Sequence, residues 1–78
     1  MTNQDVANVR AEALFVSKIQ RSDAVTSHEV RRTVRETVRQ YGVTGVAERV
    51  AEEFGEHPDT AQSRMCWCLG TVRSAYAA

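Results

Sequence analysis

Apolar residues recur at every third or fourth position along most of this chain, which is the spacing of helices that bury one face. Val6, Val9, Ala13 and Val16 follow that spacing in the first segment. No segment shows the alternation of apolar and polar residues, with a period of two, that indicates a strand. The pattern therefore predicts helices over about residues 5–20, 27–41, 45–54 and 59–76.

Capping residues and a glycine mark the two ends of the second predicted helix. Thr26 and Glu29 fit a capping box, in which the threonine oxygen accepts a hydrogen bond from an early amide of the helix. Gly42 follows the apolar stripe and is the residue type expected where a helix ends in a left-handed conformation. We therefore expect a break between the second and third helices at Gly42.

The third and fourth predicted helices are separated by a short turn. Gly55 is expected to end the third helix, and Pro58 lies where the fourth begins. Asp59 caps the fourth helix, or His57 does if Pro58 is its first residue. Because the loops are short, neighbouring helices should pack closely. The sequence thus predicts an all-α fold: one domain over residues 1–78, a compact bundle of about four short helices.

The formal net charge of the chain is zero, but the charge is unevenly placed. Residues 1–41 carry seven basic and five acidic side chains, a net of +2, whereas residues 42–78 carry three and five, a net of −2. A local basic face is therefore compatible with the neutral total. No apolar run is long enough for a signal peptide or a membrane helix, so we expect a cytoplasmic protein that does not enter membranes.

The junction between the third and fourth predicted helices has the residue types of a helix-turn-helix. That motif needs a small residue where its helices cross, a turn residue that tolerates a left-handed backbone, and a small or branched apolar residue facing inward. Ala51, Gly55 and Ala61 stand at those places. The last two helices are therefore candidates for a DNA-binding helix-turn-helix.

The same segment, residues 51–65, resembles the helix-turn-helix in region four of extracytoplasmic-function sigma factors. The residues that match the pattern of this family are Gly55, Thr60, Ala61, Ser63, Arg64 and Met65. The resemblance implies that DNA is contacted from the start of the fourth helix by Thr60, Gln62, Ser63 and Arg64. The chain departs from the family at Glu56, at Pro58 and at residues 66–70, where the family has an apolar residue, an earlier proline and a basic run. The whole chain also resembles small helical proteins of actinobacteria, which implies no function.

The second predicted helix is rich in arginine. At about 100° per residue, three of the side chains share one solvent side and the fourth lies beside them. The row consists of Arg31, Arg32, Arg35 and Arg39. Such a row could contact DNA phosphates. Alternatively, it is a solvated face whose arginines pair with Glu29, with Glu36 or with the acidic third helix.

The fourth predicted helix carries a large aromatic residue among small ones. On a helical wheel, Trp67 points away from the apolar stripe and lies beside Gly70, Thr71 and Ser74. A large ring among small side chains suits close approach by another chain, so these four residues are the candidate protein interface. Alternatively, Trp67 packs against the first helix as part of the core.

The reactive residues of the chain do not form a pattern that predicts catalysis. Cys66 and Cys68 lie about 200° apart on a helix, too far round to form a disulfide with each other or to hold one metal ion. His28 and His57 do not complete a zinc pattern, and no phosphate-binding loop or nucleophile motif is present. We therefore expect a non-enzymatic protein with reduced thiols, no metal and no cofactor.

Two interpretations of function follow from these features. The leading one is a DNA-binding or transcription-associated protein whose fourth helix enters the major groove of duplex DNA while arginines of the second helix contact the backbone. One helix-turn-helix reads few base pairs, so this interpretation predicts a homodimer. The alternative is a protein-interaction module, a helical dimer or adaptor that uses the Trp67 face. The sequence leaves open whether residues 1–20 dock on the other helices or mediate dimerisation.

Overall fold

Three α-helices and one short 3₁₀ turn make up the fold of the computed structural model, which describes residues 3–77. Helix α1 spans Asn3–Val16, the turn η1 spans Arg21–Asp23, α2 spans Ser27–Glu56 and α3 spans Pro58–Ala75. This part of the chain contains no strand, so the predicted all-α class is confirmed. The Cα radius of gyration is 11.6 Å. A compact chain of this length is expected to have a value of about 11.5 Å.

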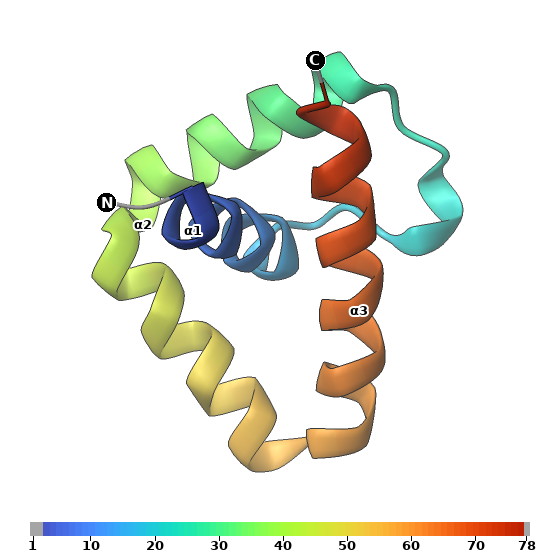
Figure 1. The fold of residues 1–78 in the computed structure, drawn as a ribbon. Coiled ribbons are helices and arrows are strands. Elements are labelled where there is room, and N and C mark those ends of the chain that lie inside the picture. The colour runs from blue at the N-terminus through green and yellow to red at the C-terminus, as the bar shows by residue number, and fades with distance from the viewer. Residues whose placement is uncertain (1–2, 78) are drawn as a thin grey trace.

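Helices α2 and α3 form the sides of a triangle, and α1 runs through it (Figure 1). α2 supplies two of the sides, a first arm over residues 27–41 and a second arm over residues 43–56, which meet at Gly42. α1 packs against both α2 and α3, which is one of the two roles left open for the N-terminal segment. The end of α3 lies beside the start of α2 and closes the triangle (Figure 1).

The number of helices differs from the prediction, because the second and third predicted helices join directly at a non-helical residue, Gly42, and form one kinked element. Gly42 has the left-handed φ that was expected, +72°, with a ψ of 165°. The helix nevertheless resumes directly after this residue, without the loop that two separate helices would need. The described chain therefore has three helices, the second of them kinked at Gly42, and not about four.

Helix α1 ends at Val16 rather than at residue 20. The Ser17 hydroxyl donates a hydrogen bond to the Leu14 carbonyl at 2.6 Å, and it accepts one from the Ile19 amide at 3.3 Å. Ile19 still packs against the core, although it does so from the segment that follows the helix. The predicted end of this helix, at about residue 20, is therefore wrong by four residues.

The predicted caps of the later helices are largely confirmed. The Glu29 amide donates a hydrogen bond to Thr26 Oγ1 at 3.1 Å. The Glu29 carboxylate accepts at 3.0 Å from the Thr26 hydroxyl, rather than from the Thr26 amide as a capping box would have it. α3 begins at Pro58 with His57 at the cap position, the second of the two predicted alternatives, but the His57 side chain forms no capping hydrogen bond.

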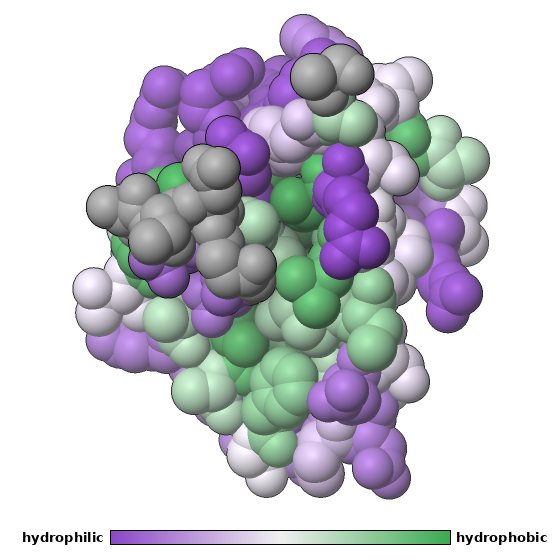
Figure 2. Space-filling model, viewed as in Figure 1, coloured by the Kyte–Doolittle hydropathy of each residue, from purple (hydrophilic) through white to green (hydrophobic). Residues whose placement is uncertain are grey.

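The core is built from all three helices. Phe15 stacks on Phe54 with ring centroids 5.9 Å apart, which ties the end of α1 to the second arm of α2. Hydrophobic surface also gathers in the hollow between that arm and α3, with hydrophilic residues around it (Figure 2). Within residues 3–77, every helix is too short or too polar to span a bilayer. The largest fully buried side chains are Leu14, Val30, Val46 and Cys68.

We predict that Gly42→Ala lowers the free energy of unfolding by about 1–3 kcal/mol, because the backbone conformation at the kink is nearly exclusive to glycine. A Cβ atom at this position would meet no atom within 4 Å, so the loss would come from the backbone alone. Chemical denaturation, monitored by circular dichroism, measures this change in the free energy of unfolding. Gly55→Ala is the control, since Gly55 lies in a helix without a positive φ and also faces open space. Equal stability of the two variants would contradict the assignment of strain to Gly42.

Candidate functional site

The side chain of Arg64 is turned inward, onto the end of α1. Its Nε donates a hydrogen bond to the Phe15 carbonyl at 2.9 Å. Its Nη2 lies 3.1 Å from the carbonyl oxygen of Ser17, 3.0 Å from that of Ile19 and 3.3 Å from that of Leu14. The end of a helix leaves carbonyl groups without helical partners and carries partial negative charge. Arg64 therefore caps α1 from α3.

Two aromatic rings flank the Arg64 guanidinium. Its Cζ lies 5.6 Å from the ring centroid of Phe15 and 5.6 Å from that of Trp67. The side chain is half-buried, and its donors are taken up by the end of α1 and the residues just beyond it. The guanidinium that was expected to contact DNA is therefore engaged inside the molecule.

The other α3 residues of the candidate DNA site are exposed. Thr60, Gln62 and Ser63 lie in the first turns of α3. Thr60 and Ser63 line a concavity of about 330 Å³ together with Glu53. Exposed carboxylates of Glu56 and Asp59 stand at the same end of the helix. The wall of the concavity also carries Arg21 and Arg64, so a phosphate backbone brought to this surface would meet charges of both signs.

The turn between α2 and α3 differs from the one that a helix-turn-helix needs. Gly55 lies inside α2, and in residues 3–77 a positive φ occurs only at Ala24 and Gly42. His57 alone separates the two helices. Ala51, expected where the helices cross, is exposed, whereas Ala61 is buried as expected.

The arginine row lies on the first arm of α2, and its members differ in their contacts. Arg31 donates a hydrogen bond from Nη1 to the Ala75 carbonyl at 2.6 Å and so caps the last turn of α3. Arg32, Arg35 and Arg39 are exposed, and no carboxylate of residues 3–77 forms a salt bridge with them. The first arm and the start of α3 stand at opposite ends of the molecule (Figure 1). The two halves of the candidate DNA site are therefore not brought together within one chain.

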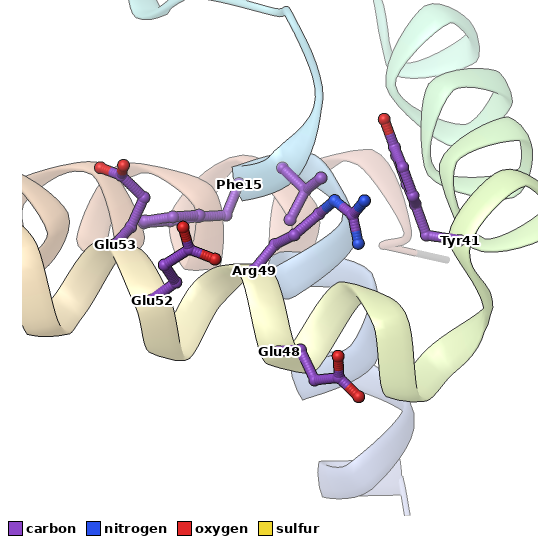
Figure 3. Close-up of a pocket in the computed structure, with 7 residues that line it drawn as sticks. Phe15, Tyr41, Glu48, Arg49, Glu52 and Glu53 are labelled. Carbon is purple, nitrogen blue, oxygen red and sulfur yellow. The ribbon is translucent and has the colours of Figure 1, made fainter.

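A cation–π contact bridges the kink in α2. The Arg49 Cζ lies 3.9 Å from the Tyr41 ring centroid, and Arg49 Nη1 donates to the Gly45 carbonyl at 3.2 Å. A Cβ atom at Gly45 would lie 3.3 Å from the Tyr41 Cβ and 3.7 Å from Arg49 Nη1, so glycine leaves room for both side chains here. Figure 3 shows Arg49 reaching toward Tyr41 in a concavity of about 530 Å³ whose wall also carries acidic side chains. These are Glu48, Glu52 and Glu53.

The four residues of the candidate protein interface are brought together. Trp67, Gly70, Thr71 and Ser74 line one surface concavity of about 380 Å³ on the outer side of α3. None of its lining residues is charged. The remaining wall comes from α3 itself, from the start of α2 and from the segment before it. It consists of Val25, Ser27, Val30, Cys66 and Ala75.

Trp67 is half-buried, and its packing against the core agrees in part with the alternative that placed it there. Its ring packs against the core on one side and lines the concavity on the other. Gly70 lies in the interior of α3, where glycine costs about 1 kcal/mol relative to alanine. A Cβ atom at this position would meet nothing within 4 Å. Packing inside the chain therefore gives no reason for glycine at position 70.

The two thiols lie in different environments, as their helical spacing predicted. Both cysteines are free; Cys66 is exposed and Cys68 is buried. Burial raises the pKa of the Cys68 thiol to about 11, an effect that the nearby positive charge of Arg64 partly offsets. Cys66 is therefore the thiol that a reagent in solution reaches first.

A cluster that the sequence analysis missed lies at the end of α2. One ligand atom from each of Glu53, Glu56 and His57 lies within 4.8 Å of the others, and His57 Nε2 is 3.9 Å from Glu56 Oε2. The helical spacing of these residues could have indicated it. All three side chains are exposed, and exposed carboxylates commonly gather at a helix end without an ion, so we assign no ligand to them.

Comparison with known proteins finds no match for this chain. No family model matches the chain, and neither a curated protein nor a solved structure matches it. The candidate site therefore rests on the geometry of the chain itself.

We predict that Arg64→Ala destabilises the fold, by about 2–4 kcal/mol, because four carbonyl oxygens lose a charged donor. Arg64→Lys should recover only part of this loss, since an ammonium group cannot reproduce the planar fork. Thermal and urea unfolding measure both effects. Arg73→Ala, an exposed arginine on the same helix, is the control. If Arg64→Ala were no less stable than Arg73→Ala, the cap would have no structural importance.

Proposed function

We propose that this chain is a non-catalytic protein-interaction module that pairs with a second copy of itself through the Trp67 face. We use that name for the surface lined by Trp67, Gly70, Thr71 and Ser74. The observation that carries the proposal is the open space at Gly70, in the middle of a concave and uncharged surface. A helix of a partner that crosses α3 at this glycine would approach the backbone closely.

The absence of charge from the Trp67 face favours a second copy as the occupant. In a two-fold dimer the same surface faces itself, so any charge on it would meet its own copy. The other large surfaces of the molecule are charged. The first arm of α2 has four arginines and two glutamates, a net of +2, and the second arm has one arginine and four glutamates, a net of −3.

The half-exposed ring of Trp67 supports the same proposal. Aromatic residues at the centre of an interface contribute much of its binding energy, because they bury a large area with little loss of conformational freedom. Here the ring is already fixed on one side by the core and by the guanidinium of Arg64. Such preorganisation lowers the entropic loss of association.

We predict that Gly70→Glu weakens self-association at least tenfold, because it places like charges across the two-fold axis. The chain should stay folded, since the new side chain would extend into open space. Sedimentation equilibrium measures the dimer dissociation constant. Gln62→Glu is the matched control: it adds the same charge to an exposed residue of α3 outside the Trp67 face. Dimers of Gly70→Glu as stable as those of Gln62→Glu would contradict the proposal, as would a wild-type chain that remains monomeric at NMR concentrations.

Binding to duplex DNA is a second candidate, favoured by one observation. Arg32, Arg35 and Arg39 form an exposed basic row without acidic partners among residues 3–77. Such a row can attract phosphates without reading a sequence. The start of α3 supports this candidate less, because Arg64 is engaged with α1 and the exposed carboxylates of Glu56 and Asp59 lie at the same end of the helix.

For this second candidate, we predict that amide chemical shifts of Arg32, Arg35 and Arg39 change when mixed-sequence duplex DNA is added at low salt. The changes should fade as salt rises, because phosphate binding releases counterions. Thr60 and Ser63 should be unaffected. Changes centred on those two residues would instead favour a reading helix, and no change at a large excess of DNA would remove DNA as a partner.

A further inference from the structure

A second concavity, of about 440 Å³, lies between α1, the first arm of α2 with the first residue of the second arm, and the end of α3. Five valines from α1 and α2 line it, and we call it the valine groove. They are Val6, Val9, Val34, Val38 and Val43. Val43 is 45% exposed, and only two large apolar side chains of residues 3–77 are exposed in this way. An apolar wall that remains open to water favours an occupant that can cover it.

Arginine side chains surround the valine groove. Arg10, Arg31 and Arg35 line it together with His28, and no carboxylate does. Two of these arginines are held in place: the Arg10 Cζ lies 3.9 Å from the Tyr76 ring centroid, and Arg31 is hydrogen-bonded to Ala75. Arg35 has no salt-bridge partner among residues 3–77. Two of the three arginine charges around the groove are therefore held in place, and none of the three forms a salt bridge with a carboxylate of residues 3–77.

We propose that the valine groove binds an acidic amphipathic helix of a protein partner. An apolar stripe of such a helix would cover the valines, and its flanking carboxylates would meet the arginines. DNA fits the groove less well, because its phosphates would match the arginines but leave the valines uncovered. The groove shares no lining residue with the Trp67 face. With both surfaces occupied, the module would be an adaptor that presents two acidic-helix sites per dimer.

The test uses a fluorescein-labelled helical peptide of about 16 residues, with leucines along one stripe and glutamates beside them. Fluorescence anisotropy should show saturable binding to the full chain. Replacing the glutamates of the peptide with lysines should abolish it. No saturable binding of the acidic peptide would overturn the proposal.

Two variants of the chain test whether the peptide binds in the valine groove. Arg35→Gln should weaken binding of the peptide about tenfold, because a charged hydrogen bond is lost. Arg39→Gln, an equal charge change on the same arm outside the groove, should leave binding nearly unchanged. Equal weakening by both variants would indicate non-specific attraction to the arm and would contradict a groove site.

Val43→Ser distinguishes a helical peptide from DNA as the occupant of the groove. It removes apolar surface without changing charge, so it should weaken peptide binding several-fold and leave binding of mixed-sequence duplex DNA unchanged. Leu69→Ser is the control, because Leu69 is similarly exposed, at 36%, and lies outside the groove. If Val43→Ser has no effect on the peptide, or if the DNA competes for the groove as strongly as the peptide does, the proposed occupant is wrong.

Discussion

The hydrogen bonds from Arg64 to the end of α1 fix the position of the helix on which the rest of the fold packs. α1 runs through the triangle formed by α2 and α3, and Ser17 caps the Ala13 and Leu14 carbonyls of its last turn but leaves the Phe15 carbonyl for another donor. Arg64 supplies that partner from α3, while Phe15 in the same turn stacks on Phe54 of α2. One turn of α1 is therefore joined to both other helices, and the guanidinium between Phe15 and Trp67 also fixes the tryptophan of the candidate interface.

A second arginine also caps the end of a helix, at the other end of the triangle. Arg31 caps the last turn of α3 through the Ala75 carbonyl and thereby fixes α3 against the start of α2. Arg49 stacks on Tyr41 across the kink at Gly42. Because these arginines are engaged within the chain, the basic surface that remains is smaller than the sequence indicates. It is also separated from the acidic second arm by the bend at Gly42, which gives a chain of zero net charge two faces of opposite sign.

The helical pattern of the sequence was enough to predict the all-α class, the buried stripes and the cap at Thr26. It was also enough to bring Trp67, Gly70, Thr71 and Ser74 onto one surface, because residues at helical spacing lie on one side of α3 wherever that helix packs. The continuity of α2 could not be predicted in this way, since a glycine with a positive φ is equally consistent with a kink and with an end.

Contacts between distant segments account for the rest of the difference between prediction and structure. Whether an arginine faces solvent or a helix end depends on what the fold places opposite it, and the spacing of Arg64 within α3 does not contain that information. The valine groove also depends on contacts between distant segments, since its wall combines residues from α1 with residues from α2. The sequence placed Val6 and Val34 on separate stripes and gave no sign that they meet.

The central claim, that a second copy of the chain covers the Trp67 face, is tested most directly by amide chemical shifts recorded over a dilution series. Dilution shifts a monomer–dimer equilibrium without any substitution and reports on every amide at once. We predict concentration-dependent changes that cluster on Ser27, Val30 and residues 66–75 and leave the arginine row unaffected. Identical spectra at all concentrations, or changes centred on another surface, would contradict the claim.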